Sequence, residues 1–283
     1  MLFKTVLLCL GLIAGSLAVP ASQDQPDYSE FFDNSDASAR IVGGTVAAEG
    51  SVPYMAALTN GLFIRSLVCG SSIITARTLL TAAHCVEALF SFNSLSSSLR
   101  AIVGTNRWNL GGVAYSIARN VTHEHYVSAR IKNDIGILIT ASEIMLTDVI
   151  KPVPVGFDFV PGGVMVRAVG WGRIRAGGAL SDQLLELVKG TIDGDQCVKD
   201  AKKASIVLNI KNMPPVEPHI ELCTFHSEGH GMCNGDSGSP LVRLDRGEQV
   251  GAVSWGFPCA LGAPDMFVRI SAFHEWLMQH TVL

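Results

Sequence analysis

Residues 233–240 read CNGDSGSP, a short stretch that decides between an ordinary turn and a loop that presents a nucleophile. Glycine, aspartate and serine all favour turns, each for its own backbone reason, so a surface loop is the simple interpretation. A serine hydroxyl is a poor nucleophile unless an adjacent base, itself oriented by a third group, activates it. Ser237 is therefore a candidate nucleophile only if the chain supplies that base and that acid.

Two other motifs supply candidates for these partners. LLTAAHCVE (79–87) leads an apolar strand into small residues and His84, and a disulfide at Cys85 would hold the backbone beside the imidazole. NDIGILI (133–139) places Asp134 at the head of an apolar strand, where a buried carboxylate needs a specific partner. Taken singly, His84 is open to a structural role in the core, and Asp134 to capping a turn.

The composition excludes several classes of function. The 283 residues are 48% hydrophobic and 16% charged, with a formal net charge of -4, which suits a chain that buries a large core. No basic block, zinc-type spacing or phosphate-binding glycine loop occurs in the sequence. We therefore expect no nucleic-acid partner, no metal and no cofactor.

The first part of the chain has the character of segments that are removed. Residues 1–18, MLFKTVLLCLGLIAGSLA, combine one early lysine, an apolar run and small residues at the cleavage spacing of a signal peptide. The apolar run is too short to span a membrane, so we predict a secreted protein without a membrane anchor. Residues 19–40 carry five acidic side chains and no apolar period, and they end at Arg40, which indicates a propeptide that does not fold by itself.

Cysteine usage agrees with secretion. Once Cys9 is removed with the signal peptide, an even number of cysteines remains, which suggests three disulfides and leaves their pairing open. A metal site is disfavoured, because none of these cysteines lies in a CxxC motif. The remaining cysteines are Cys69, Cys85, Cys197, Cys223, Cys233 and Cys259.

From residue 41 onward, short β-rich runs alternate with turn signals, a pattern typical of an all-β barrel or sandwich. Two stretches have helical character: 193–204, with Asp193 as its cap, and 271–280, whose Phe273, Trp276 and Leu277 share one face suited to core packing. The polar tract 91–99 is predicted to be a surface loop. The predicted strands lie within 66–75, 100–104, 134–140, 164–172 and 248–256.

Taken together, these motifs resemble the chymotrypsin-like serine proteases, and in particular arthropod digestive chymotrypsins and serine collagenases. The resemblance covers residues 41–283, and the combination of TAAHC with GDSGSP in one chain is highly specific. It implies an all-β fold of two six-stranded antiparallel β-barrels, with the active site in the cleft between them and a C-terminal helix. The first barrel would take about 41–150 and the second, with the helix, about 151–283. The motifs are IVGG (41–44), TAAHC (81–85), NDIGIL (133–138), CNGDSGSP (233–240) and SWG (254–256).

The resemblance also implies roles for individual residues. His84 would be the general base, Asp134 its orienting acid and Ser237 the nucleophile, in the order that separates this family from other triad hydrolases. The backbone N–H groups of Gly235 and Ser237 would form the oxyanion hole. Ser254 would support the triad acid, and its strand would pair with the substrate backbone.

Activation and disulfide pairing are implied in the same way. Cleavage after Arg40 by a trypsin-like protease would free the amine of Ile41 to pair with Asp236, and the propeptide would then leave. The implied disulfides are Cys69–Cys85, Cys197–Cys223 and Cys233–Cys259.

Specificity is where the chain departs from the common pattern. The pocket floor, six residues before the nucleophile, is Gly231 rather than the aspartate of trypsin-like members, and Gly256 resembles an open wall. Asp265 stands where the family usually has a small residue. It either turns away, leaving a chymotrypsin-like pocket for Phe, Tyr and Leu, or it broadens the pocket towards Arg and Lys by charge pairing.

The resulting hypothesis is a monomeric secreted endopeptidase, active in digestion and present in the gut lumen, whose partners are protein or peptide substrates, inhibitors and the activating protease. The alternatives are a non-catalytic binding protein on the same fold and a trypsin- or collagenase-like protease of broad specificity. The loop at 104–116 lacks the acids that calcium requires, and Asn120 begins a glycosylation sequon.

Overall fold

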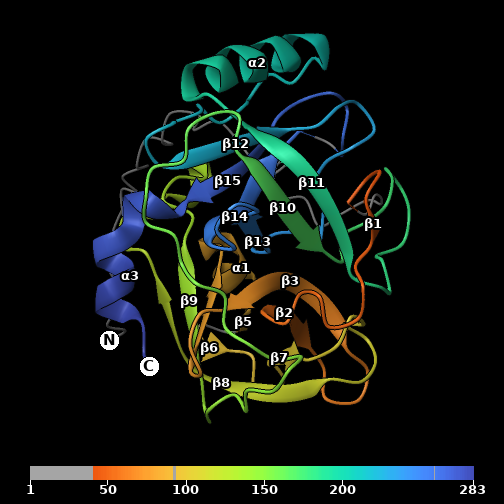
Figure 1. Cartoon of the computed structure of the whole chain (residues 1–283), viewed down its shortest axis with the longest axis vertical. Helices are drawn as coiled ribbons and strands as arrows, with labels where there is room; N and C mark the ends of the chain where they lie inside the picture. The colour runs from red at the N-terminus through yellow and green to blue at the C-terminus, as the bar shows by residue number, and fades with distance from the viewer. Residues whose placement is uncertain (1–40, 92–93, 258) are drawn as a thin grey trace, which may run out of the picture.

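The predicted strands pair in antiparallel fashion and close into two six-stranded barrels, one above the other in Figure 1. The computed structural model describes residues 41–91, 94–257 and 259–283. The predicted signal peptide, propeptide and Arg40 lie outside the described residues. The sequence pattern did not decide between a barrel and a sandwich. The structure confirms the two barrels that the resemblance implied. Closure pairs the edge strands that an open sheet would leave exposed.

The first barrel closes in the strand order β2-β3-β4-β9-β8-β7. A two-stranded ribbon of β5 (Phe90–Ser91) and β6 (Ser94–Leu95) lies beside it, where the sequence predicted only a surface loop. The barrel strands are β2 (Met55–Asn60), β3 (Ser66–Ile73), β4 (Thr78–Thr81), β7 (Arg100–Val103), β8 (Val113–Thr122) and β9 (Gly136–Thr140).

The second barrel follows the order β11-β10-β13-β14-β15-β12 and closes because β12 also pairs with β11. A seventh strand, β1 (Thr45–Val46), adds to the free side of β11. The barrel strands are β10 (Met165–Gly170), β11 (Leu185–Ile192), β12 (Glu221–Phe225), β13 (Pro240–Arg243), β14 (Gln249–Gly256) and β15 (Asp265–Arg269).

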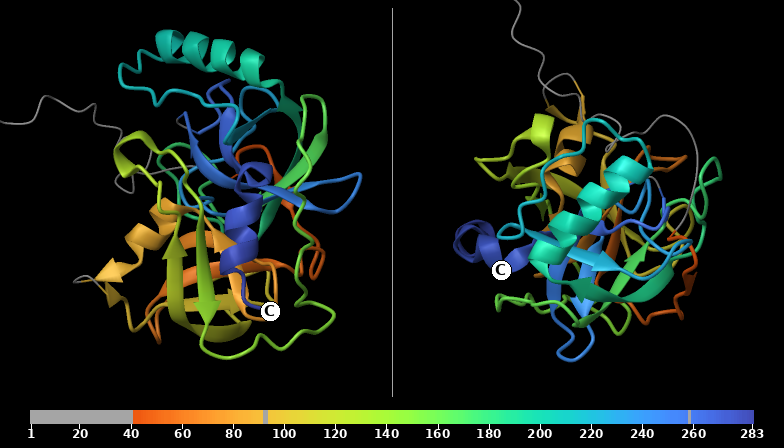
Figure 2. Two further views of the ribbon diagram at one scale, coloured as in Figure 1. Left: turned by 90° about the vertical axis from the view of Figure 1, so that its left-hand side faces the viewer. Right: turned by 90° about the horizontal axis from the view of Figure 1, so that it is seen from above.

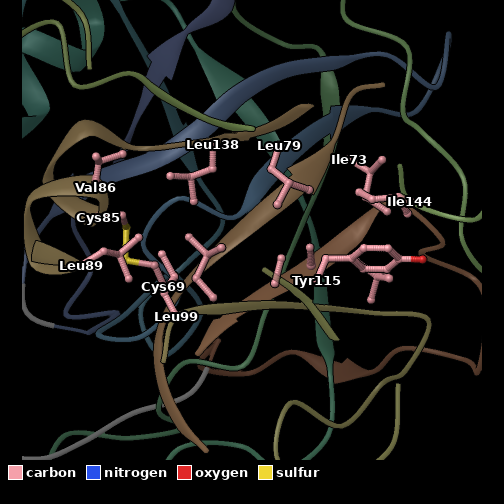
Figure 3. Packing of buried hydrophobic residues seen from close by; sticks show 14 of the residues in the cluster. Cys69, Ile73, Leu79, Cys85, Val86, Leu89, Leu99, Tyr115, Leu138 and Ile144 are labelled. Carbon is pink, nitrogen blue, oxygen red and sulfur yellow. A yellow bond between two sulfur atoms is a disulfide. The ribbon is translucent and has the colours of Figure 1, made fainter. Parts of the chain in front are cut away.

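Each barrel encloses its own apolar core. In the first barrel, Ile73, Leu79 and Leu138 meet inside the strands, and the Cys69–Cys85 disulfide closes one end of the cluster (Figure 3). Figure 3 shows these side chains pointing toward one another from different strands. A third cluster, with Met55 from the first barrel and Trp171, Leu184 and Val242 from the second, packs the two barrels together. The relative position of the barrels is therefore held by apolar contact.

Both helices that the sequence predicted are present, but only α2 begins where predicted, since α3 begins three residues later than the expected 271. Helix α2 (Gly194–Val207) is capped by Asp193, whose carboxylate accepts hydrogen bonds from the N–H groups of Asp195 and Gln196 at 3.0 and 3.4 Å. Helix α3 (His274–His280) follows the 3-10 turn η3 (Ile270–Phe273). A short helix α1 (Ala83–Ala88) and a turn η2 (Ser128–Arg130) were not predicted. Within the described residues, every helix is too short or too polar to cross a membrane.

The two ends of the described chain cross from one barrel to the other. The N-terminal strand β1 pairs with β11 of the second barrel, although the sequence division placed residue 41 onward with the first. Helix α3 runs alongside β9 of the first barrel (Figures 1 and 2), where Trp276 and Leu277 pack against Leu80 and Ile137. The α3 crossing ties the barrels together by burying apolar side chains, whereas the β1 crossing does so by backbone pairing, since both residues of β1 are exposed.

We expect Leu277→Ala to lower the free energy of unfolding by about 2–5 kcal/mol, because it leaves a cavity between α3 and the first barrel. Leu277 is 2% exposed, whereas the neighbouring Met278 is 67% exposed. Met278→Ala is thus a matched control that should change stability by less than about 0.5 kcal/mol. Urea unfolding of the two variants measures the difference, and equal losses would show that the α3 contact does not hold the barrels.

Candidate active site

His84 lies at the start of α1, where the chain leaves strand β4. Ala82 and Ala83 are fully buried, and small side chains there let the helix begin close against the barrel. The disulfide between Cys85 and Cys69 joins this helix to β3. The sequence predicted the tether but not the helix, because the residue at its N-cap position, Ala82, has no side chain that can cap it.

Asp134 provides the missing cap. Its Oδ1 accepts a hydrogen bond from the backbone N–H of His84 at 2.9 Å, in the first turn of α1. Its Oδ2 lies 2.8 Å from His84 Nδ1 and accepts a hydrogen bond from the Ser254 hydroxyl at 2.5 Å. With Nδ1–H donated to the carboxylate, the neutral imidazole keeps Nε2 as its acceptor. The side chain of His84 remains 11% exposed and that of Asp134 only 2%.

The loop that carries Ser237 is held by both barrels. The carbonyl of Ser237 accepts a hydrogen bond from the N–H of Gly70 in β3 at 2.8 Å, and the N–H of Gly238 donates to Val253 in β14 at 2.8 Å. Gly238 has φ +74° and lies so close to β4 that a Cβ there would stand 2.2 Å from Thr81 Oγ1. Only glycine fits this position, which brings the loop against the segment that leads into His84.

Two N–H groups of the loop have no acceptor among the described residues. Gly235 has φ +93°, a left-handed conformation that glycine adopts without strain. Among the described residues, the N–H groups of Gly235 and Ser237 donate no hydrogen bond. Backbone donors left unpaired beside a partly exposed serine are free to bind an anionic oxygen.

Asp236 belongs to the same loop, between Gly235 and Ser237, and is 0% exposed. Its carboxylate accepts hydrogen bonds from the N–H groups of Gly172 at 2.7 Å and Cys233 at 3.1 Å. Burial raises the pKa of Asp236 to about 7, and the two hydrogen bonds oppose that shift. A cation close to the Asp236 carboxylate would lower this pKa and favour the ionised carboxylate.

The segment after Arg40 approaches the same region. Ile41 is 1% exposed and packs in the core of the second barrel with Met232 and Leu185. Val42 pairs with Gly231 through two backbone hydrogen bonds of 2.9 and 3.2 Å. The predicted activation segment and the predicted pocket floor are therefore neighbours.

The three residues predicted to form the specificity pocket meet in the structure. A Cβ at Gly231 would lie 3.1 and 3.3 Å from the two carboxylate oxygens of Asp265, and a Cβ at Gly256 would lie 3.6 Å from Oδ1. Asp265 therefore faces both glycines, which contradicts the interpretation that it turns away. Lys189 of β11, which the sequence analysis did not identify, places its Nζ 2.6 Å from Asp265 Oδ2.

A second buried ion pair joins the barrels next to the site. Lys132 lies two residues before Asp134, and its Nζ is 2.6 Å from Oε1 of Glu221 in β12. Each of the two side chains is 5% exposed. Glu221 also accepts a hydrogen bond from Trp255 Nε1 at 2.7 Å, one residue beyond Ser254. Burial raises the pKa of Glu221, and the Lys132 ammonium opposes that shift. Glu221 thus anchors residues on both sides of the Asp134–Ser254 hydrogen bond.

All three disulfides have the pairing that the resemblance implied: Cys69–Cys85, Cys197–Cys223 and Cys233–Cys259. Cys69, His84 and Cys85 also form a cluster of potential metal ligands, but both sulfurs are consumed by their disulfide and offer no thiolate. Asn120 lies partly buried in β8, opposite Leu138, and its glycosylation stays a prediction.

Comparison with known proteins agrees with this geometry. The family model described as Trypsin matches residues 41–277. Chymotrypsin-2 of Vespa crabro is 32% identical over 242 residues, covering 85% of this chain and 99% of that protein. Serine protease SP24D of Anopheles gambiae is 33% identical over 244 residues, covering 84% and 80%. Trypsin alpha-4 of Lucilia cuprina is 30% identical over 240 residues, covering 84% and 86%.

We expect Glu221→Gln to destabilise the protein by about 3–5 kcal/mol, because it leaves the Lys132 ammonium buried without its anion. Asp148→Asn makes the same chemical change in an exposed pair with Lys151, where Asp148 is fully exposed, and should cost little. Urea unfolding measures the free energy of unfolding of both variants. A loss no larger for Glu221→Gln than for Asp148→Asn would contradict the anchoring role.

Proposed function

The chain belongs to the trypsin family of serine proteases, and on that premise we propose that His84, Asp134 and Ser237 hydrolyse peptide bonds through an acyl-enzyme. The observation that carries the proposal is the set of three hydrogen bonds that Asp134 accepts from His84 and Ser254. That set orients the imidazole and leaves its Nε2 as the proton acceptor.

In the proposed reaction, the Ser237 hydroxyl attacks the substrate carbonyl carbon while His84 Nε2 takes its proton. The Asp134 carboxylate stabilises the imidazolium that results, and the same proton then passes to the leaving amine. Water repeats the sequence on the acyl-enzyme and releases the second product. Activity should fall in acid, because a protonated imidazole has no acceptor for the serine proton.

The N–H groups of Gly235 and Ser237 would bind the oxygen of the tetrahedral intermediate. Their lack of any partner among the described residues supports this role. Donors fixed before the reaction stabilise developing charge without reorganising, and one such donor contributes roughly 10²–10³-fold to the rate.

Activation would follow cleavage after Arg40. The new Ile41 amine would pair with the buried carboxylate of Asp236, which directly precedes the nucleophile. The burial of Ile41 and of Asp236 supports this proposal. The raised pKa of Asp236 agrees with it, since an uncompensated carboxylate at this site gains from an added cation.

For substrate choice we propose a chymotrypsin-like preference for Phe, Tyr and Leu at P1, the residue before the cleaved bond. Gly231 in place of an acid at the pocket floor, together with Gly256 in its wall, supports room for large uncharged side chains. Secretion, a digestive role in the gut lumen and a monomeric state belong to the same proposal. A non-catalytic binding role is disfavoured, because such proteins usually lack a triad residue.

Labelling with a fluorophosphonate tests both catalysis and activation. After trypsin treatment we expect the wild type to be labelled at Ser237, and Arg40→Lys, which trypsin still cleaves, to behave in the same way. Arg40→Ala should stay uncleaved and turn over substrate slower by roughly a hundredfold or more, because its oxyanion hole is not set. An unlabelled Ser237 in cleaved wild type would refute the enzyme, and full activity in uncleaved Arg40→Ala would refute the activation step alone.

A pH series tests the state of Asp236 in the uncleaved precursor. Because folding raises the pKa of Asp236 from 3.8 to about 7, the precursor should lose stability as the pH rises between these values. The loss is on the order of 4 kcal/mol. In the Arg40→Ala background, Asp236→Asn should remove that slope, whereas Asp148→Asn should leave it. Urea unfolding at several pH values measures it, and identical slopes in all three proteins would exclude a buried neutral carboxyl.

A further inference from the structure

A buried lysine lies behind the predicted specificity pocket. Lys189 occupies an inward-facing position of β11, and its side chain is 0% exposed. Its ammonium lies 2.6 Å from Asp265 Oδ2 and 5.0 Å from the centre of the Phe267 ring. Among the described residues, no other carboxylate lies within ion-pair distance of it. A buried ammonium needs one compensating anion, and Asp265 is that anion.

The carboxylate of Asp265 lies beside the two glycines of the predicted pocket. Its Oδ2 accepts hydrogen bonds from the Lys189 ammonium at 2.6 Å and from the backbone N–H of Met232 at 3.1 Å. Oδ1 is the oxygen nearest the position that a Cβ would take at Gly256. The Asp265 side chain is 9% exposed, so it is largely buried rather than extended into solvent.

We propose that Lys189 determines the charge preference of the pocket by neutralising Asp265, so that uncharged P1 side chains are accepted and arginine and lysine are rejected. The inference rests on the proposed function, because it assumes that Gly231 and Gly256 line the P1 pocket. It replaces the expectation that Asp265 broadens the pocket towards basic side chains.

The physical reason is competition for one anion. An arginine or lysine at P1 would lose its hydration on entering the pocket and would have to share Asp265 with the Lys189 ammonium. The two cations would then repel each other across a short distance in a region of low dielectric. An uncharged side chain incurs neither penalty, and the internal ion pair stays intact. Lys189 is thus a positioning residue that acts through Asp265.

Three variants separate the two charges of the pair. Lys189→Met keeps a long side chain but frees the Asp265 carboxylate, Asp265→Asn frees the Lys189 ammonium, and the double variant has neither charge. Each is cleaved after Arg40 and titrated with a fluorophosphonate. The kcat/KM values for succinyl-Ala-Ala-Pro-X p-nitroanilides with X as Phe, Arg or Glu are then measured per labelled site.

We expect the wild type to prefer Phe over Arg by at least roughly tenfold. Lys189→Met should raise the Arg-to-Phe ratio by roughly tenfold or more, and Asp265→Asn should raise the Glu-to-Phe ratio in the same manner. The double variant should return both ratios to the wild-type values. A reciprocal change of this kind does not arise from a loss of folding, which would lower all three rates together.

An unchanged Arg-to-Phe ratio in labelled Lys189→Met would overturn the inference while leaving the protease intact. If that variant does not fold, the wild type and Asp265→Asn decide: a wild type that cleaves after Arg as readily as after Phe, or an Asp265→Asn without any gain for Glu, also overturns it. Failure of cleaved wild type to take the label would instead refute the proposed function itself.

Discussion

The carboxylate of Asp134 accepts hydrogen bonds from residues that are 50 and 120 positions away in the chain. His84 belongs to a helix at the edge of the first barrel, and Ser254 to a strand of the second. Since Asp134 is nearly inaccessible to water, these donors replace the solvation that its charge loses on burial. The same contacts cap α1 and orient the imidazole, so the two barrels must meet in one arrangement for the carboxylate to be satisfied.

Other buried charges around the site follow the same rule. Glu221 is paired with Lys132 across the barrels, and Asp265 with Lys189 inside the second barrel. Only Asp236 has hydrogen bonds but no cation in contact among the described residues, and burial accordingly raises its pKa to about 7. In the proposed activation, this single acid without a cation would couple removal of the propeptide to the geometry of the oxyanion hole.

Apolar packing fixes the position of the two barrels relative to each other, and with it the positions of the site residues. The cluster around Met55 and Trp171 joins the barrels, β1 and α3 cross between them, and Gly238 lets the nucleophile loop approach β4 to within contact distance. Close-packed interiors transmit small displacements, so the packing of the cores fixes the backbone that carries the loop and the imidazole, and the hydrogen bonds of Asp134 then orient the ring.

The roles of His84, Asp134 and Ser237 were inferred from motifs that resemble those of a known family. From the sequence alone came the strand segments, the helix behind Asp193 and the apolar face of α3. These features are local: strand alternation, capping and turn chemistry depend on residues a few positions apart. Lys189 shows what local sequence features cannot predict. It stands at an inward position of an alternating strand, which signals a buried charge, but its partner lies 76 residues away. Only the order and register of the strands decide which acid meets it, and hence the charge that we propose for the pocket.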